Sequence, residues 1–301
     1  MRTLTVGSLA LSRIILGTSY FGTNLSESVA FDLMDTYLAL GGRTIDTARV
    51  YGAWDAAGIG AAERVVGAWL ESRRPEGVTL ITKGAHPPKG DMTASRLSRD
   101  CILDDAARSA ETLGRVPDLW FLHRDDVTRP VEEIAESMAA LTEAGLARHV
   151  GASNWRAARI EAYNAYAVAH GLPCFVCSQI QWSLAVTTPE AYGDPTLVCM
   201  NDEEYAWYRA HRFPVLAFSS QAKGFFSKAI AGGLDSLPEK AKKRFATPEN
   251  LARLEQVRAE CARTGRSPAA VALSYITENE VPGCAIVGCS GVEQLKDSLS
   301  A

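Results

Sequence analysis

Two hydrophobic patterns alternate along the chain. Short apolar runs rich in β-branched residues are typical of buried strands, and the segments between them repeat apolar residues at helical spacing. The strand-like runs lie at 13–19, 43–48, 78–84, 118–124, 148–154, 175–182, 214–220 and 284–290. The helical patterns lie at 26–40, 61–73, 98–113, 131–144, 156–170, 203–212, 248–264 and 268–278. The sequence therefore predicts strands and helices in strict alternation.

Local signals support the ends of these helical patterns. Glycines follow several of them, at 41–42, 114, 145, 171 and 265, where a left-handed residue commonly ends a helix. Ser267 is placed to cap the last helical pattern, and Pro268 would occupy its first position. These signals favour separate helices rather than one long repeat.

This alternation over 301 residues predicts an α/β fold, a (β/α)8 TIM barrel, as a single domain spanning 1–301. A doubly wound sheet would need a G-x-G-x-x-G turn after its first strand, and the chain reads GTSYFG there. The segments LTV and LALSRII form a predicted β-hairpin around Gly7 and Ser8 that closes the bottom of the barrel. The long connections after strands six and seven, 184–202 and 221–247, predict functional loops over the C-terminal face.

Composition and charge narrow the possible functions. The chain is 47% hydrophobic and 22% charged, as is typical of a soluble globular protein. A net charge of -4 predicts no nucleic-acid partner, and no apolar run of about 18 residues predicts a membrane span. Seven scattered cysteines favour free thiols and a cytoplasmic location. No feature of the sequence predicts an oligomeric state.

Cys174 and Cys177 have the spacing of a redox or zinc half-site. They lie on a predicted strand, where residues three apart point to opposite faces. No second pair or nearby histidine completes a zinc site. We therefore predict no metal and no disulfide exchange at this pair.

Polar side chains follow three consecutive predicted strands. Asp46 and Tyr51 lie in TIDTARVYG after strand two, Lys83 ends strand three, and His123 ends strand four. Because the carboxyl ends of barrel strands meet at one face, and apolar residues normally fill the barrel, we expect these four side chains to form a site.

Their chemistry suits a proton donor to a carbonyl oxygen. Tyrosine titrates near about 10 and is a weak acid at neutral pH, but a nearby lysine cation stabilises its anion. Asp46 would keep Lys83 charged and aimed, and His123 would orient the substrate oxygen. Protonating a carbonyl oxygen is useful only if a nucleophile attacks the carbon, so this arrangement needs a hydride donor.

The chain is similar over nearly its whole length to the aldo-keto reductase superfamily, whose successive signatures are matched in order by TIDTARVYG, ITKG, LHRDD, VGASNW, SQIQWSL and AIVGCSGVEQLKDSL. The resemblance implies a barrel that binds a nicotinamide cofactor without a Rossmann fold and reduces aldehydes or ketones. It implies catalytic roles for Asp46, Tyr51, Lys83 and His123, with Tyr51 as the general acid.

The resemblance also implies which residues bind the cofactor. They are Gly17, Thr18, Asp46, Ser153, Asn154, Gln179, Phe218, Ser219, Gln221, Lys223, Gly224, Gly288, Ser290, Gln294 and Asp297. Phe218 replaces the tyrosine that the family usually stacks on nicotinamide, and Ser298 replaces a usual asparagine. Gly288 stands where many relatives carry a cation for the 2′-phosphate. Relatives with glycine and glutamine in these places often use NADP, so NADP(H) is favoured and NAD(H) is possible.

The basic run at 240–244, KAKKR, is a candidate substitute for the missing cation, although a solvated charge run is the favoured interpretation. Predicted walls of the substrate pocket are Tyr20, Trp54, His86, His123 and Trp182, with Tyr192 as a further candidate. Aromatic walls with polar edges suit a sugar-like or aromatic aldehyde. The expected partner is thus a small-molecule carbonyl substrate.

Two other functions are compatible with parts of this pattern. The first is an aldolase that forms a Schiff base on Lys83, which would require a neutral lysine. The second is a nucleotide-sensing protein with negligible turnover, because some members of the superfamily are partner subunits of membrane channels. Asp46 beside Lys83 disfavours the aldolase, since the carboxylate would hold the lysine in its charged form.

Overall fold

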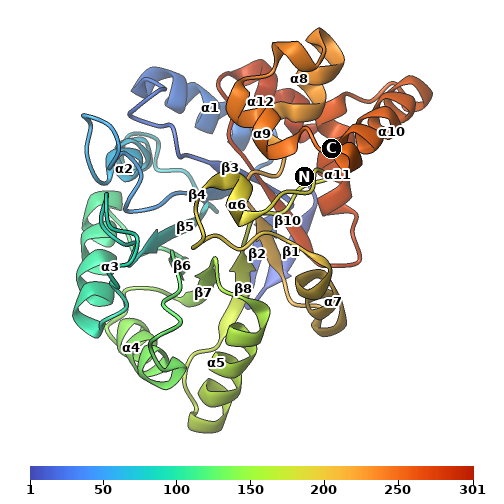
Figure 1. Ribbon diagram of the computed structural model, residues 1–301. Helices are drawn as coiled ribbons and strands as arrows, with labels where there is room; N and C mark the ends of the chain where they lie inside the picture. The colour runs from blue at the N-terminus through green and yellow to red at the C-terminus, as the bar shows by residue number, and fades with distance from the viewer.

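The computed structural model describes residues 1–301, and its centre is a closed barrel of eight parallel strands (Figure 1). Around the barrel the strands follow the order β10-β3-β4-β5-β6-β7-β8-β9. They are β3 (Ile14–Gly17), β4 (Thr44–Asp46), β5 (Thr79–Gly84), β6 (Leu119–Leu122), β7 (His149–Ser153), β8 (Phe175–Gln179), β9 (Val215–Ala217) and β10 (Gly283–Val287). The predicted (β/α)8 TIM barrel is confirmed.

Helices surround the barrel (Figure 1). They are α1 (Glu27–Ala39), α2 (Ala61–Arg73), α3 (Arg99–Leu113), α4 (Val131–Glu143), α5 (Ala157–His170), α6 (Pro189–Tyr192), α7 (Asp202–His211), α8 (Phe225–Gly232), α9 (Glu239–Phe245), α10 (Pro248–Thr264), α11 (Pro268–Thr277) and α12 (Val292–Leu299). Two short 3-10 helices, η1 (Ala222–Gly224) and η2 (Leu234–Ser236), precede α8 and α9. Every helix predicted from periodicity is present, whereas α6, α8, α9 and α12 were not predicted.

The expected caps fix several helix ends. The hydroxyl of Ser267 accepts a hydrogen bond from the amide of Ala270 at 3.0 Å, and Pro268 opens α11. Gly171 and Gly265 end α5 and α10 with φ of 67° and 74°, a conformation that glycine adopts at little cost. The local signals in the sequence therefore set these boundaries.

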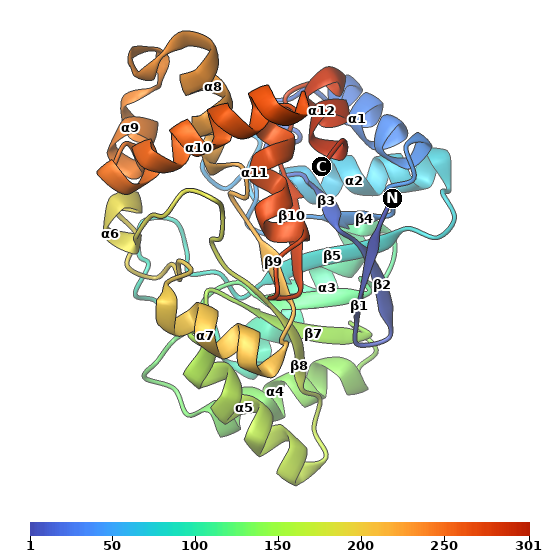
Figure 2. The same ribbon diagram turned by 90° about the vertical axis from the view of Figure 1, so that its right-hand side faces the viewer.

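An antiparallel hairpin closes the bottom of the barrel. Its strands are β1 (Thr3–Val6) and β2 (Leu9–Ser12). Val6 and Leu11 are buried in the interior cluster that also holds Ile81 and Phe121 from the barrel strands. Figure 2 shows the hairpin at the opposite end of the barrel from α6 and α9. The predicted N-terminal closure is confirmed.

The two long connections predicted after strands six and seven follow β8 and β9. The first carries α6, and the second carries η1, α8, η2 and α9. They pack on each other: the ring of Tyr192 meets that of Phe245 edge-on, with centroids 6.4 Å apart, and the guanidinium of Arg244 lies 4.3 Å from the centre of the Tyr192 ring. Together they form one layer over the C-terminal face of the barrel (Figure 2).

All seven cysteines are free thiols. Cys177 is buried in the barrel interior, whereas Cys174 precedes β8 and is partly exposed, so the two thiols lie in different environments. None of the helices combines the length and apolar character that a membrane span requires.

The hairpin provides a stability test. We expect Leu11→Ala to lower the free energy of unfolding by about 2–5 kcal/mol, because it leaves a cavity among residues that cannot readily collapse. Leu9→Ala is the matched control, since Leu9 is only partly buried on the same hairpin, and should cost less. Urea unfolding followed by circular dichroism measures both. Equal losses would contradict a plugging role for Leu11.

Candidate active site

Strand alternation aims the candidate site residues into the barrel. Ile81, Phe121 and Cys177 lie in the interior cluster of β5, β6 and β8. Residues two positions further along a strand point the same way. Lys83, His123 and Gln179 occupy those positions, so their side chains form the next layer up, at the C-terminal face where barrel enzymes hold their sites.

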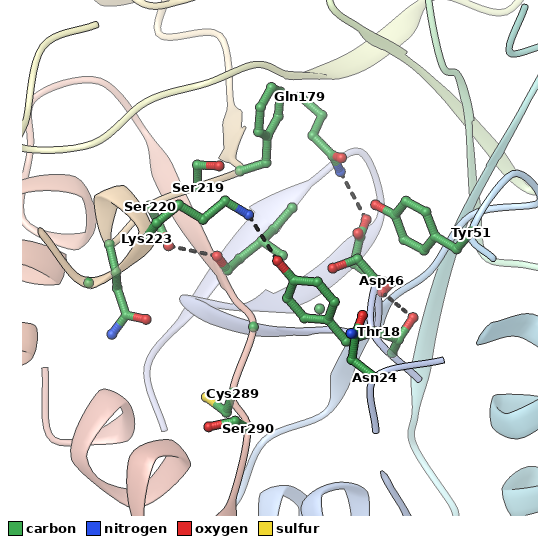
Figure 3. A pocket seen from close by; sticks show the side chains of 18 of the residues that line it. Thr18, Asn24, Asp46, Tyr51, Gln179, Ser219, Ser220, Lys223, Cys289 and Ser290 are labelled. Carbon is green, nitrogen blue, oxygen red and sulfur yellow. Dashed lines mark hydrogen bonds between the residues drawn. The ribbon is translucent and has the colours of Figure 1, made fainter. Parts of the chain in front are cut away.

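A buried ion pair lies at the centre of this layer. Lys83 Nζ donates to Asp46 Oδ1 at 2.7 Å and to the carbonyl of Thr47 at 2.7 Å. Both charged residues are only 1% exposed. Gln179 Nε2 donates to the other carboxylate oxygen of Asp46 at 2.9 Å, as Figure 3 shows. Although burial opposes its charge, the carboxylate of Asp46 keeps the pKa of Lys83 above the ordinary lysine value.

The third contact of Lys83 is Tyr51. Lys83 Nζ lies 3.3 Å from Tyr51 Oη and 5.0 Å from the centre of its ring. Burial raises the pKa of Tyr51, and the charge of Lys83 is the main effect opposing that rise. Tyr51 therefore holds its proton at neutral pH, next to a cation that would stabilise its anion.

His123 lies beside Tyr51, with ring centroids 6.1 Å apart in an edge-on arrangement. Its imidazole makes no hydrogen bond to another residue, and its Nδ1 is buried without a partner. Burial, followed by the proximity of His86, Arg124 and Lys83, lowers the pKa of His123 well below the ordinary value. The structure thus holds a neutral imidazole that is available to a ligand.

Tyr51 and His123 line a cavity of about 760 Å³, a size typical of small-ligand sites. Other predicted site residues that line it are Gly17, Thr18, Tyr20, Asp46, Ser153, Asn154, Gln179, Phe218, Ser219, Gln221, Lys223, Gly224, Gly288, Ser290 and Gln294. Lys83 lies behind Asp46 and Tyr51 rather than in the cavity wall. The cavity therefore brings nearly all of the predicted residues together.

This chain is similar to known proteins over almost its entire length. The sequence model of the Aldo/keto reductase family matches residues 13–301. The chain belongs to the aldo/keto reductase family. It is 29% identical over 301 residues to "Uncharacterized oxidoreductase YrpG" of Bacillus subtilis (strain 168), covering 97% of this chain and 88% of that protein. It is 26% identical over 316 residues to "Norsolorinic acid reductase stcV" of Emericella nidulans, covering 98% of this chain and 75% of that protein.

Family membership and the names of these relatives support an oxidoreductase of carbonyl compounds. Aldo/keto reductases generally use nicotinamide cofactors, and the donor set of this cavity fits one. The amides of Asn154 and Gln179 lie against His123 and Asp46, and Phe218 offers a flat ring. Lys223 supplies a charge suited to phosphate, and α8 begins directly after Gly224, where helix amides favour an anion.

The loop after β9 holds an unusual backbone in this aldo/keto reductase. Ser219, Ala222 and Lys223 have φ of 50°, 49° and 57°, which costs free energy for residues that carry a Cβ. Lys223 also reaches across the cavity, with Nζ 3.3 Å from the hydroxyl of Tyr20, as the dashed line in Figure 3 shows. This loop is thus shaped by its position over the cavity rather than by local preference.

At the far end of the cavity, Gln294 Oε1 accepts hydrogen bonds from the amide and hydroxyl of Ser290, at 2.8 and 3.0 Å. Ser290 lies just before α12 and Gln294 lies within it. Gly288 leaves open space where a side chain would stand. The polar groups here are neutral, as the sequence indicated.

Besides Lys83 and His86, three predicted residues do not line the main cavity. Trp182 is 1% exposed and packs in the outer core against Tyr205 and Tyr275, because it follows the inward-facing Gln179 by three residues and so points outward. Trp54 is 56% exposed, and its ring lies edge-on to that of His86 with centroids 5.8 Å apart. Asp297 lies on α12 outside the cavity wall. The structure therefore does not place Trp182 at the substrate pocket.

His86 occupies a separate position. Its ring lies 4.8 Å from that of His123, and it lines a smaller cavity of about 210 Å³ beside the main one. Its Nδ1 lies 2.7 Å from the carbonyl of Pro87, and burial lowers its pKa to about 4. The ring of His86 thus packs edge-on against the ring of His123.

Three cations of the cavity wall were missed by sequence reasoning or, for Arg244, favoured as solvated. They are Arg124, Lys228 and Arg244, which with Lys223 give the wall four cations. Arg244 belongs to the KAKKR run and stacks on Tyr192, which also lines the cavity; the solvated interpretation therefore fails for this residue. Arg124 directly follows His123, and that adjacency at a strand end was the available signal.

The lowered pKa of His123 has a direct test. We expect the imidazole signals of His123 to stay those of a neutral ring between about pH 5.5 and 8, where an ordinary histidine would titrate. Nuclear magnetic resonance of ¹⁵N-labelled protein measures this, with His123→Asn identifying the signals. A titration between about pH 6 and 7 would contradict the burial argument.

Proposed function

We propose that this protein reduces an aldehyde or ketone to an alcohol by hydride transfer from a nicotinamide nucleotide. The observation that carries the proposal is the position of Tyr51 Oη, 3.3 Å from Lys83 Nζ at the wall of the cavity. A protonated phenol beside a fixed cation is an arrangement suited to proton donation.

In this proposal Tyr51 is the general acid. Its proton passes from Oη to the carbonyl oxygen of the substrate, and the phenolate left behind is stabilised by Lys83. Asp46 fixes Lys83 through the 2.7 Å contact and keeps it charged. The neutral imidazole of His123 donates a hydrogen bond that orients the substrate oxygen toward Tyr51. The nicotinamide group, when bound, supplies hydride to the carbonyl carbon.

The cofactor would be held along the length of the cavity. Ser153, Asn154 and Gln179 would bind the carboxamide of the nicotinamide, and Phe218 would stack on its ring. Lys223 and Gly224 would contact the pyrophosphate, and Ser290 with Gln294 would bind the adenosine end. NADP(H) is our favoured cofactor, because four cations line a wall whose only carboxylate is the paired Asp46.

The contacts of Lys83 argue against a Schiff-base aldolase. Its Nζ contacts Asp46, Thr47 and Tyr51, and the lysine lies outside the cavity wall. An aldolase lysine must be neutral and reach its substrate. The pKa of Lys83 is instead raised by Asp46, against the effect of burial.

Removing the phenol tests the general acid. We expect Tyr51→Phe to lower kcat for reduction of benzaldehyde by about 10²–10⁴-fold, the contribution usual for general acid catalysis. Nucleotide affinity should be nearly retained, since the ring remains. NADPH consumption measures the first, and quenching of tryptophan fluorescence measures the second.

Two results would contradict this assignment. A Tyr51→Phe variant with undiminished kcat would remove Tyr51 from the proton transfer. A wild-type protein that binds nucleotide tightly but turns over no aldehyde or ketone would instead favour a nucleotide-sensing protein. Covalent trapping of a carbonyl compound on Lys83 by borohydride would favour the aldolase.

A second substitution tests the cofactor preference. Gln294→Glu keeps the oxygen that accepts from Ser290 but adds a negative charge where the 2′-phosphate would lie. We expect the Kd for NADP⁺ to rise about tenfold or more relative to that for NAD⁺, because like charges repel. Titration calorimetry measures both constants. Glu293→Gln is the matched control on the same turn, and an unchanged ratio in both variants would contradict binding of the phosphate here.

A further inference from the structure

Arg124 is a largely buried cation at the end of the cavity that holds Tyr51 and His123. It follows His123 directly, beyond the end of β6, and lines the cavity together with Tyr51 and His123. Its side chain is 11% exposed. Neither hydride transfer nor proton donation from Tyr51 uses this guanidinium, so its position calls for another explanation.

The protein only partly satisfies the guanidinium of Arg124. Nε donates to Thr196 Oγ1 at 3.0 Å and Nη1 donates to the carbonyl of His123 at 2.9 Å. Nη2 lies 3.4 Å from Asp194 Oδ2. A guanidinium has five N–H donors, so three contacts leave two donors without a protein acceptor. The guanidinium is therefore able to donate hydrogen bonds to a further ligand.

The charge of Arg124 is also weakly balanced. A good arginine–carboxylate contact is about 2.7–2.9 Å long, and the contact with Asp194 is longer, at 3.4 Å. The other carboxylate oxygen of Asp194 already accepts from the amide and the hydroxyl of Thr196, at 3.0 and 2.6 Å. Burial lowers the pKa of Arg124, which reflects the cost of holding this cation away from water.

No carboxylate of the cavity wall is free to pair with Arg124. Asp46 is the only carboxylate that lines the cavity, and its two oxygens are taken by Lys83 and Gln179. Of the other three cations of the wall, Lys223 and Lys228 belong to the connection after β9, where Lys228 Nζ donates to the carbonyl of Lys223. Arg244 of α9 lies against the ring of Tyr192. Arg124 is the cation of this wall that adjoins His123 in the chain and whose charge acts on both Tyr51 and His123.

We propose that Arg124 binds a carboxylate of the substrate, so that the enzyme prefers carbonyl compounds that carry a carboxylate group. A planar guanidinium can donate to both oxygens of a carboxylate and offset its negative charge, and a neutral substrate carries no such charge. This inference rests on the proposed reduction of a carbonyl compound and names its substrate class.

Two other roles for Arg124 make different predictions. In the first, Arg124 only anchors the loop after β8 through Asp194 and Thr196. Its loss would then affect charged and neutral substrates alike. In the second, its positive charge only lowers the pKa of Tyr51, against the larger opposing effect of burial. Its loss would then shift the pH profile for every substrate by the same amount.

The experiment compares the three isomers of carboxybenzaldehyde with their methyl esters, at saturating NADPH. For wild type we expect at least one acid to exceed its ester in kcat/KM by about 10- to 100-fold, the usual effect of a hydrogen-bonded charge. Arg124→Gln should abolish this preference through KM, and Arg124→Lys should restore part of it. Acid-to-ester ratios near one in wild type would overturn the proposal while leaving carbonyl reduction intact.

Two further variants separate the explanations. Asp194→Asn removes the competing carboxylate, so it should raise the acid-to-ester ratio, whereas a loop-anchoring role predicts equal losses for Asp194→Asn and Arg124→Gln on all substrates. Lys228→Gln removes another cation of the same wall, and it should leave the ratio unchanged. A ratio that falls as much in Lys228→Gln as in Arg124→Gln would overturn a specific site at Arg124.

Binding provides a readout that needs no turnover. In the presence of NADP⁺, benzoate should bind wild type more tightly than benzamide by calorimetry, and Arg124→Gln should remove that difference. Equal affinities in wild type would overturn the proposal even if no aldehyde is reduced. A preference for benzoate without any turnover would uphold the carboxylate site and count against the proposed reduction.

Discussion

The ion pair between Lys83 and Asp46 organises the upper end of the barrel. Burying two charges is costly unless each gains several well-placed partners. Here the carbonyl of Thr47, the amide of Gln179 and the hydroxyl of Tyr51 complete the shell. These contacts connect β4, β5 and β8 across the mouth of the barrel. The cation that would stabilise a phenolate in the proposed reaction therefore also holds together the strands that carry it.

Much of this arrangement is readable from the sequence because strand geometry is restrictive. Once the strands are located, alternation determines which side chains face inward. This rule places Lys83, His123 and Gln179 inside the barrel. The same rule explains Trp182, which falls on the outward face. Arg124 was harder to assign, since its polar partners Asp194 and Thr196 lie about 70 residues away and depend on how a long loop folds.

Three of the four unpredicted helices share one physical property. α6, α8 and α9 have 4, 8 and 7 residues, lengths at which a helix is unstable by itself and depends on tertiary packing. Ala185, Phe225 and Phe245 supply that packing in a small cluster of their own. The layer over the cavity is therefore specified by contacts between two distant loops, which no local pattern reveals.

The hairpin below the barrel separates two demands on the chain. Val6 and Leu11 close one end of the barrel with apolar contacts, while the ion pair of Lys83 and Asp46 lies at the other end. Barrel folds accept very different loops above a constant base. Laboratory evolution of this protein should therefore be most productive when diversity is confined to the loops after β8 and β9. The apolar contacts that keep the barrel folded then stay unchanged in every variant.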